Sequence, residues 1–224
     1  MKNIIAALLL FPLLAHAQEE LKVSPDERTL EVQFTPFGSN PININGIRFR
    51  KFKDETSAFR LNVFLGLDSD SNIKQQKDDE NNRLELNTSS SAFSVNIRPG
   101  FERHLPGTDR LSPYFGGELD LAIQTSSEEE EFQNTTNDKF ETTLRNQNGF
   151  FRFGINAIAG MDFYVAKKLY LGTEFGFGFS YNKLLSVQLE SDEQGFTEPD
   201  HQKRGGSFNL GPNVNAQIRL GYAF

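Results

Sequence analysis

The chain contains three histidines, His16, His104 and His201, the side chains best suited to take a proton from a hydroxyl near neutral pH. The last two have acid and hydroxyl neighbours in the sequence: Asp109 and Ser112 after His104, and Asp200 and Ser207 around His201. A hydrolase or an acyltransferase needs such neighbours. A histidine in a polar connection is more often solvated than catalytic, so the sequence favours a non-enzymatic protein, with a lipid-modifying enzyme as an alternative.

Two short acidic runs occupy residues 78–80 and 128–131. A calcium site needs six or more oxygens from a shaped loop, with alternating ligands and a glycine turn, and consecutive carboxylates lack that spacing. The chain also has no cysteine, which excludes thiolate metal sites and disulfides. The sequence therefore predicts no metal site and no cofactor, and it indicates that both runs are solvated acidic loops.

A larger set of charged residues, seven acids and six arginines, alternates with apolar residues along the chain. Side chains of a β-strand point to opposite faces with period two, so the whole set would share one face of a sheet. Arginine forks bind carboxylates through paired hydrogen bonds, which indicates a structural charge network. The predicted members are Glu31, Arg48, Arg50, Arg60, Asp68, Arg98, Glu102, Glu118, Asp120, Arg152, Asp162, Glu174 and Arg219.

The elements that must position these charges are clearest at residues 149–181. The second half of this stretch places Leu171, Phe175 and Phe177 on one face, and Gly172 and Glu174 on the other. The first half alternates in the same way, and residues 166–168 form a tight turn between the halves. The stretch therefore predicts a hairpin of two long strands, each with one apolar and one polar face.

The same alternation recurs along the chain and predicts eight strands in total. The other six strands are expected at residues 29–37, 46–52, 57–68, 91–103, 113–125 and 208–224. Connections after the second, fourth and sixth strands are short, whereas those at 69–90, 126–148 and 182–205 are long and polar. Long loops at one rim and short turns at the other are typical of outer-membrane barrels.

Composition supports one exported domain. The 224 residues suit a single domain, and the net charge of -7 argues against binding of nucleic acid. Residues 1–17 have a basic start, an apolar core and a small-residue cleavage site, which predicts a secretory signal peptide. Residues 18–28 are expected to form a short periplasmic lead and residues 29–224 the barrel. No later segment approaches the roughly 20 apolar residues of a membrane-spanning helix, so any span must consist of strands.

The charges on one face of each strand indicate whether the apolar face lies on the inside or the outside of the predicted barrel. A soluble lipocalin-like barrel would bury its apolar face, leaving an interior crowded with Phe and Leu. An eight-stranded barrel is just wide enough for side chains to fill. The sequence therefore predicts an all-β, eight-stranded antiparallel up-and-down transmembrane β-barrel with a charged, side-chain-filled lumen.

Four prolines fit this arrangement less easily. Proline has no backbone NH, and a closed barrel has no free edge where the missing hydrogen bond would not matter. Pro36, Pro113 and Pro212 are compatible with the rims of the barrel. Pro99 lies inside the fourth strand, so we expect a β-bulge or a vertical shift of the strand at that position.

The last residues, 217–224, resemble the C-terminal signal of bacterial outer-membrane barrels, with Leu220, Tyr222 and the final Phe224 on one face. Such signals are recognised by the barrel-assembly machinery. Together with the segments 162–172 and 210–214, the chain resembles the small porin-like outer-membrane β-barrel family of Bacteroidota. The resemblance implies an eight-stranded barrel of the OmpA/OmpX type, and this family provides no catalytic motif to transfer.

These observations predict a non-enzymatic outer-membrane protein with a structural or interaction role. A small passive or gated channel is the main alternative. The expected partners are outer-membrane lipid and lipopolysaccharide, the barrel-assembly machinery during biogenesis, and an unidentified protein reached through the extracellular loops. Divalent ions could bridge the acidic loops weakly to lipopolysaccharide.

Overall fold

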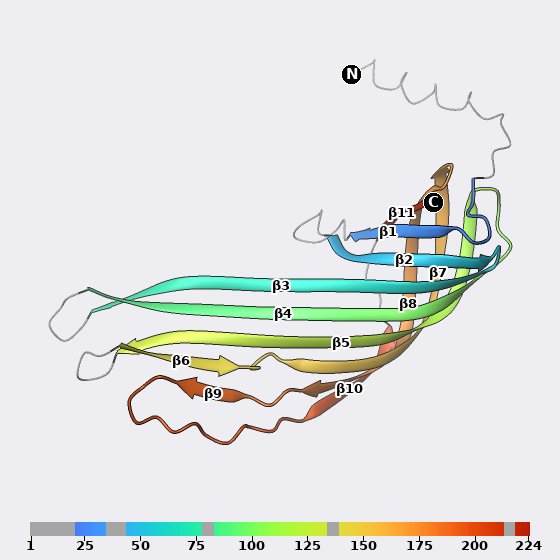
Figure 1. Ribbon diagram of the computed structural model, residues 1–224. Coiled ribbons are helices and arrows are strands. Elements are labelled where there is room, and N and C mark those ends of the chain that lie inside the picture. The colour runs from blue at the N-terminus through green and yellow to red at the C-terminus, as the bar shows by residue number, and fades with distance from the viewer. Residues whose placement is uncertain (1–20, 35–43, 78–82, 134–138, 213–217) are drawn as a thin grey trace, which may run out of the picture.

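The computed structural model describes residues 21–34, 44–77, 83–133, 139–212 and 218–224 (Figure 1). All regular elements in this part of the chain are β-strands, and it contains no helix long and apolar enough to cross a membrane. The strands are β1 (Arg28–Phe34), β2 (Ile44–Asp54), β3 (Ser57–Lys77), β4 (Arg83–His104), β5 (Leu111–Gln133), β6 (Lys139–Arg145), β7 (Phe150–Ala166), β8 (Leu169–Leu184), β9 (Gln188–Ser191), β10 (Gly206–Pro212) and β11 (Ile218–Ala223).

Eight strands form a closed antiparallel ring, in the order β1, β2, β3, β4, β5, β7, β8 and β11. The ring closes where Leu30 of β1 lies opposite Tyr222 of β11. The predicted eighth strand corresponds to β10 and β11, which both pair with β8 on either side of residues 213–217. The antiparallel ring of eight strands is therefore as the sequence predicted.

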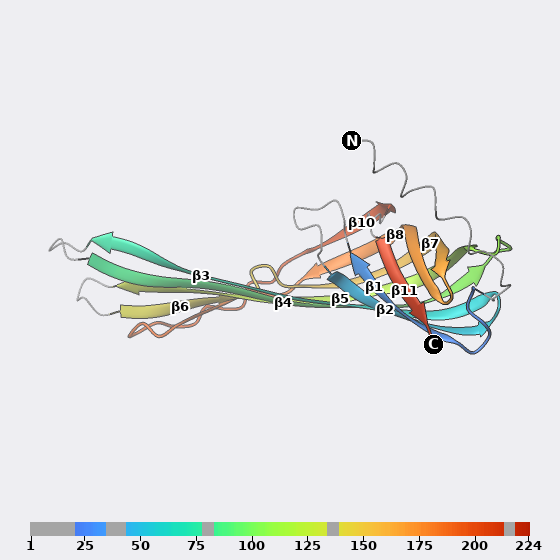
Figure 2. The ribbon, with the colours of Figure 1, turned by 90° about the horizontal axis from the view of Figure 1, so that it is seen from above.

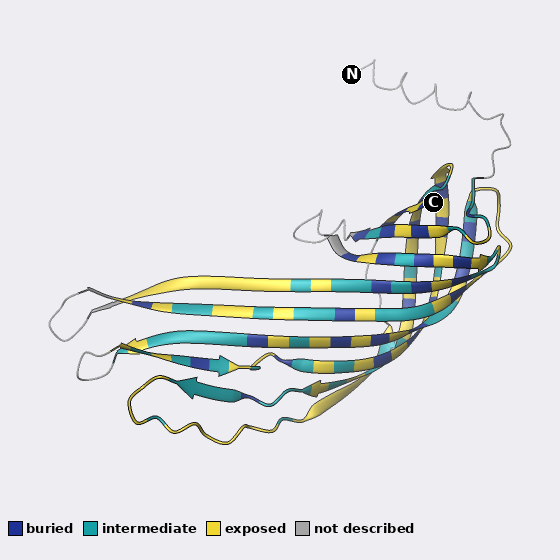
Figure 3. Cartoon of the chain, viewed as in Figure 1, coloured by how far each residue is buried: buried dark blue, intermediate teal, exposed yellow. Residues whose placement is uncertain are grey.

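The alternation of polar and apolar residues in the sequence corresponds to the inner and outer faces of the ring. Figure 3 shows buried and exposed residues alternating along β1, β2, β5 and β7. Arg50 and Asp162 are fully buried inside the ring, whereas Phe101 is 65% exposed on the outside. The predicted hairpin of β7 and β8 turns at Lys168, whose φ of 59° is the left-handed conformation of a tight turn.

The prediction of long loops is largely wrong, because β3, β4 and β5 continue far beyond the ring. Figure 2 shows these strands, with β6, extending well past β1, β2 and β7. We call this part the projecting sheet: residues 68–77 of β3, 83–91 of β4 and 126–133 of β5, with β6 and β9. Most of its side chains are polar on both faces. Apolar contacts are few, such as the stacking of Phe132 on Phe140, so the sustained period-two hydrophobic signal of a strand is missing from its sequence. The acidic run 128–131 consequently lies in β5, and run 78–80 lies outside the described residues.

Pro99 is accommodated without the expected bulge or shift. The register between β4 and β5 is the same on both sides of it, from Ile97 opposite Leu121 to Gly100 opposite Glu118. Only the pairs of Arg98 and Pro99 are absent from that ladder, while Pro99 keeps its position opposite Leu61 of β3. A local gap of two pairs is thus sufficient. Pro113, the third residue of β5, lies near the rim as expected. Pro212 ends β10 but lies opposite Phe177 in the middle of β8, so its expected place at a rim is wrong, and Pro36 lies outside the described residues.

The end of the ring that carries the short turns is covered by residues 21–27. Val23 packs with Phe52, Tyr164 and Tyr170 in a small apolar cluster across this end. Lys168 anchors the segment through its backbone NH, which donates to the Leu21 carbonyl at 3.0 Å, and through its ammonium group, which contacts Glu27. Partial burial by itself would raise the pKa of Glu27, but the hydrogen bond and charge of Lys168 together with the Ser24 backbone hydrogen bond outweigh it, so the pKa lies below its usual value.

Candidate functional site

Charged side chains from all eight strands of the ring meet inside it. We call them the charge network: Glu31 on β1, Arg48 and Arg50 on β2, Arg60 on β3, Arg98 and Glu102 on β4, Glu118 and Asp120 on β5, Arg152 and Asp162 on β7, Glu174 on β8, and Arg219 on β11. The six arginines balance the six carboxylates. The register of the ring brings them together because period two puts each of them on the inner face.

The innermost part is a pair of arginines that share two carboxylates. Arg50 Nε lies 2.6 Å from Glu31, and its Nη2 lies 2.8 Å from Asp162. Arg219 contacts the same carboxylates at 2.8 and 3.0 Å. All four side chains are fully buried or nearly so, and Arg50 also pairs with Glu102 at 2.9 Å. Four strands of the ring, β1, β2, β7 and β11, are tied by these contacts, and β4 joins through Glu102.

Glu174 is the second centre of the network. Arg48 and Arg60 each bind it through two parallel hydrogen bonds of 2.7 to 3.0 Å. Its Oε2 also accepts a 2.5 Å hydrogen bond from the Tyr114 hydroxyl. Arg60 continues to Glu102 and to Glu118 at 3.0 and 3.1 Å. Bidentate arginine–carboxylate pairs are geometrically specific, so this arrangement fixes the rotamers of the groups that fill the ring.

A third group lies closer to the projecting sheet and is partly exposed. Asp120 forms ion pairs with Arg98, whose Nε lies 3.3 Å away, and with Arg152, whose Nε lies 3.0 Å away. The two arginines are 18% and 26% exposed, in contrast to the buried arginines below them. Arg98 also stacks on Phe64, with its guanidinium carbon 5.0 Å from the ring centroid. This layer closes the network on the side of the projecting sheet.

Asp68, the remaining predicted member, is not part of the network. It lies in β3 where that strand leaves the ring, it is exposed, and no ion pair joins it to another described residue. Sequence alternation placed it on the correct face. It could not show that β3 runs on past the end of the ring.

The interior leaves little empty space. One cavity of about 30 Å³, lined by Gln33, Arg48 and Arg219 among others, has room for about one water molecule. Glycines opposite the large groups make close packing possible. A Cβ at Gly221 would lie 2.1 Å from the Tyr170 ring, and one at Gly172 would lie 2.5 Å from the guanidinium of Arg219.

Sequence reasoning missed the tyrosines as members of the site. Tyr170 donates to Glu31 at 3.0 Å, and Tyr114 donates to Glu174. Both tyrosines lie on the polar face of their strands, which is the one signal that could have identified them. Asn62, which accepts from Arg48 Nε at 2.5 Å and donates to Glu118 at 3.0 Å, carried the same signal.

His104 makes contacts that resemble part of a hydrolase site. Its Nδ1 lies 2.9 Å from Ser112 Oγ and its Nε2 lies 3.3 Å from Glu102, whereas no described contact joins it to Asp109. The imidazole is buried beside Phe52 and the Tyr114 ring, with centroid separations of 5.2 Å. Ser112 is only 8% exposed, and neither it nor His104 lines a cavity described here. The arrangement extends the charge network and gives a substrate no visible access.

The remaining candidates do not converge on a site. His201 is exposed and lies 3.5 Å from Glu198 and 3.3 Å from Gln188, away from the ring interior. In the acidic run of β5, Glu130 contacts Lys74, while Glu131 accepts from Asn87. Among the described residues, no group of three or more His, Asp or Glu side chains is placed to hold a metal ion.

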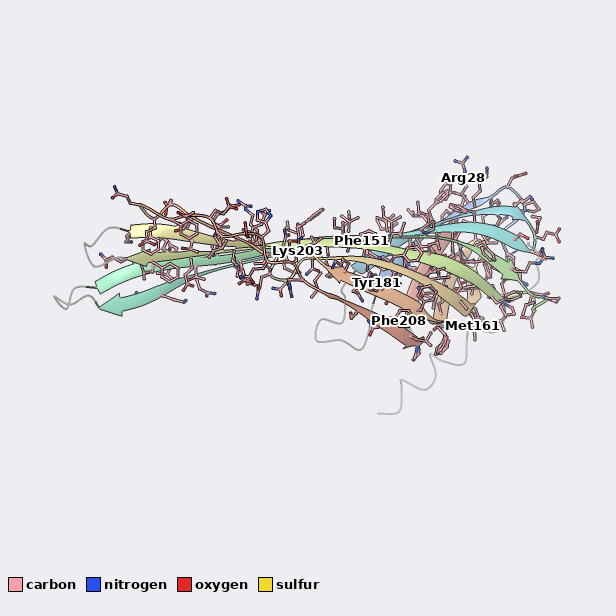
Figure 4. All side chains as sticks on the ribbon, turned by 90° about the horizontal axis from the view of Figure 1, so that it is seen from below. Arg28, Phe151, Met161, Tyr181, Lys203 and Phe208 are labelled. Atoms are coloured by element: carbon pink, nitrogen blue, oxygen red, sulfur yellow. The ribbon has the colours of Figure 1, made fainter. Side chains whose placement is uncertain are left out.

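The predicted assembly signal lies on the outside of the ring. Leu220, Tyr222 and Phe224 are 43%, 54% and 58% exposed at the end of the chain. They continue an apolar outer surface that includes the labelled Phe151, Met161 and Tyr181 in Figure 4.

Comparison with known proteins gives one family. The family described as "Putative OmpA-OmpF-like porin family" matches residues 54–216, which is most of the chain. A search of curated proteins finds no significant match.

Two solved structures are also similar to the chain. They are CarO of Acinetobacter baumannii, with 13% identity and a TM-score of 0.38, and CarO2 of the same organism, with 10% identity and a TM-score of 0.37. They cover 92% and 91% of this chain and all of their own. These scores are too low to support an inference about fold or role. The expected Bacteroidota origin and OmpX type stay predictions.

Proposed function

The chain belongs to the OmpA-OmpF-like porin family of outer-membrane β-barrels, and we propose that it is a non-conducting member whose role is structural or partner-binding. The observation that carries this proposal is the charge network. Ion pairs cross the ring from β2 to β7 and β8 and from β3 to β8, so an aqueous path along the axis would have to break them.

Two further features support a closed lumen. At the turn end, the apolar cluster of Val23, Phe52 and Tyr164 lies across the ring below the network. In addition, an eight-stranded ring has an interior that side chains can fill, whereas water-filled porins use about 16 strands. A small or gated channel, the alternative, would need both the cluster and the network to move.

The outer face of the ring suits a membrane. Leu65, Leu67 and Phe93 are 49% to 74% exposed, and Phe101 marks the opposite end of the same surface. From Phe93 to Phe101 a strand rises about 26 Å, close to the apolar height of an outer-membrane barrel before tilt is considered. The projecting sheet would then lie outside the membrane, on the side away from the short turns.

The projecting sheet is the part that could bind a partner. β3 pairs with β4 along its whole length, but β2 covers its other edge only to Val63. Within the described residues, the edge from Phe64 to Lys77 is unpaired. It has neither a proline nor a bulge, two of the devices that commonly block exposed edges, although charged residues such as Asp70 and Lys74 lie along it. Such an edge can accept an extended segment of another protein as an added strand.

Conductance is the decisive test of the closed lumen. The purified protein, shown to be folded by a band that shifts on boiling, is inserted into planar bilayers. We expect no current steps. Reproducible steps of uniform size from the folded protein would support the channel alternative and contradict the proposal. Absence of the boiling shift in outer-membrane fractions would instead contradict the barrel itself.

The binding edge is tested with single thiols, since the chain has no cysteine of its own. Ile73→Cys places a thiol on the open strand β3, and Ser90→Cys places one on β4, which is paired on both sides. Cross-linking on intact cells should give a discrete heavier band from Ile73→Cys and none from Ser90→Cys. Equal labelling without an adduct in both variants would argue against a partner at this edge.

A further inference from the structure

A cleft of about 590 Å³ lies on the outside of the ring, at the end that carries the short turns. The end of β2, the start of β3 and the end of β4 form it. Lys51 lies opposite Phe59, which lies opposite Phe101 on the next strand, and Arg103 lies opposite Ser57 one step nearer the turn. Three neighbouring strands therefore present an aromatic floor, Phe59 and Phe101, which is bordered by Lys51 on β2 and by Arg103 on β4 nearer the turn.

The cations of this cleft are not neutralised by the protein. Lys51, Lys53 and Arg103 are exposed, and no described ion pair involves any of them. Within the described part of the chain, the one hydrogen bond of the Arg103 side chain goes to Ser57 Oγ, at 3.2 Å. The acids that line the cleft are Asp26, which is exposed, and Glu102, whose carboxylate points inward to the charge network. The local charge is thus positive on a chain whose net charge is -7.

The cationic row continues around the rim. Arg28 of β1 lies opposite Lys51, and Figure 4 shows it extending from this end of the ring. The hairpin of β7 and β8, which β5 and β11 separate from these strands in the ring, differs because its Lys168 is bound by Glu27. Free cations therefore gather on the side formed by β1 to β4.

We infer that this cleft binds an anionic glycerophospholipid of the periplasmic leaflet. The phosphate would lie against Lys51, Lys53 and Arg103, and an acyl chain would lie along the half-exposed rings of Phe59 and Phe101. Long cationic side chains at a membrane boundary place their charges at the headgroups while their stems cover apolar surface. The inference rests on the proposed function, which puts the short-turn end at the periplasmic boundary.

Charge complementarity favours this ligand over a zwitterionic lipid. Each basic residue near an anionic lipid surface strengthens the attraction between the protein and the lipid, and this contribution falls as ionic strength rises. Three unpaired cations should give a preference for phosphatidylglycerol over phosphatidylcholine of about tenfold or more. A free phosphate would use the cations but would gain nothing from the aromatic floor.

The test measures binding of short-chain phosphatidylglycerol and phosphatidylcholine to the full chain in micelles, at low and high salt. The wild type should prefer phosphatidylglycerol about tenfold, with the preference reduced by salt. The variant carrying Lys51→Gln, Lys53→Gln and Arg103→Gln should lose the preference. A matched control, Lys74→Gln, Lys139→Gln and Lys203→Gln, removes the same charge from the distant sheet and connecting segment and should keep it.

Equal affinity of the wild type for the two lipids, or an unchanged preference in the cleft variant, overturns the inference. Phe59→Ser with Phe101→Ser separates a lipid from a free phosphate: weaker phosphatidylglycerol binding with unchanged inorganic phosphate binding supports the lipid, and equal effects on both overturn it. The boiling shift is recorded for every variant. Loss of that shift in the wild type would contradict the proposed barrel, whereas a folded wild type without lipid preference contradicts only this inference.

Discussion

Replacement of Arg50 by methionine is the strongest test of the charge network. Arg50 is fully buried and lies within 2.6 to 2.9 Å of Glu31, Glu102 and Asp162, so its loss leaves three buried carboxylates short of a partner. Breaking a buried ion pair by removing one partner costs about 3–5 kcal/mol. Arg219 still pairs with Glu31 and Asp162, which keeps the expected loss of unfolding free energy within that range rather than at a multiple of it.

Arg152→Met is the matched control. This arginine is 26% exposed and contacts Asp120, which keeps Arg98 as a second partner. Because solvent partly screens this ion pair, we expect the substitution to lower the unfolding free energy by about 1 kcal/mol or less. The stability loss of Arg50→Lys should lie between those of Arg152→Met and Arg50→Met. An ammonium keeps the charge but cannot reproduce the three contacts of a planar guanidinium.

The assay is a urea titration of protein folded in lipid vesicles, read from the fraction of the band that still shifts on boiling. The predicted order of stability is wild type, Arg152→Met, Arg50→Lys and Arg50→Met, from highest to lowest. An Arg50→Met protein within about 0.5 kcal/mol of the wild type would refute the reasoning, since surface substitutions produce changes of that size. A larger loss from Arg152→Met than from Arg50→Met would do the same.

Three further predictions concern other parts of the molecule. Phe153→Arg on the outer face should destabilise the protein in vesicles by about 2–4 kcal/mol if that face meets lipid, and an equally stable variant would argue for a water-exposed surface. Gly221→Val should lower the folded fraction, because its Cβ would lie 2.1 Å from the Tyr170 ring, and adding Tyr170→Ala should restore it in the same gel assay. In the projecting sheet, hydrogen bonds from Arg145 hold the pKa of Glu190 below its usual value. The contact is therefore present at neutral pH and lost as pH falls through that lowered pKa, and Arg145→Gln should return the Glu190 pKa, followed by NMR, to its usual value.

Much of the ring could be predicted from local alternation. The hairpin of β7 and β8 and its turn at Lys168 follow from the period-two pattern, and the inward direction of residues such as Arg60 and Glu118 follows from the same pattern. Pro99 misled the prediction because a proline removes one donor but does not by itself shift a register held on both sides.

The projecting sheet could not be predicted in this way. Residues 69–77 and 126–133 are polar on both faces apart from Ile73 and Phe132, because both faces mostly meet water once the strands leave the ring. Their strand structure comes mainly from backbone pairing, such as Ser71 opposite Ser89, with only a small apolar contact around Phe132 and Phe140. A polar loop and a polar two-sided strand have similar sequences.

The sequence by itself determined the faces of the strands, because side-chain direction in a strand is a local property of the backbone. Alternation alone does not show which face is inside. The many charges of one face, which can pair within a narrow lumen, indicated that the arginines and carboxylates share the interior and that the apolar surface lies outside. Only the tertiary structure decided which of them pair. Arg219 meets Glu31, 188 residues away, because closure of the ring places β11 beside β1 and sets their register. Such contacts depend on the register of every pair of neighbouring strands around the ring, and no local sequence pattern encodes that register.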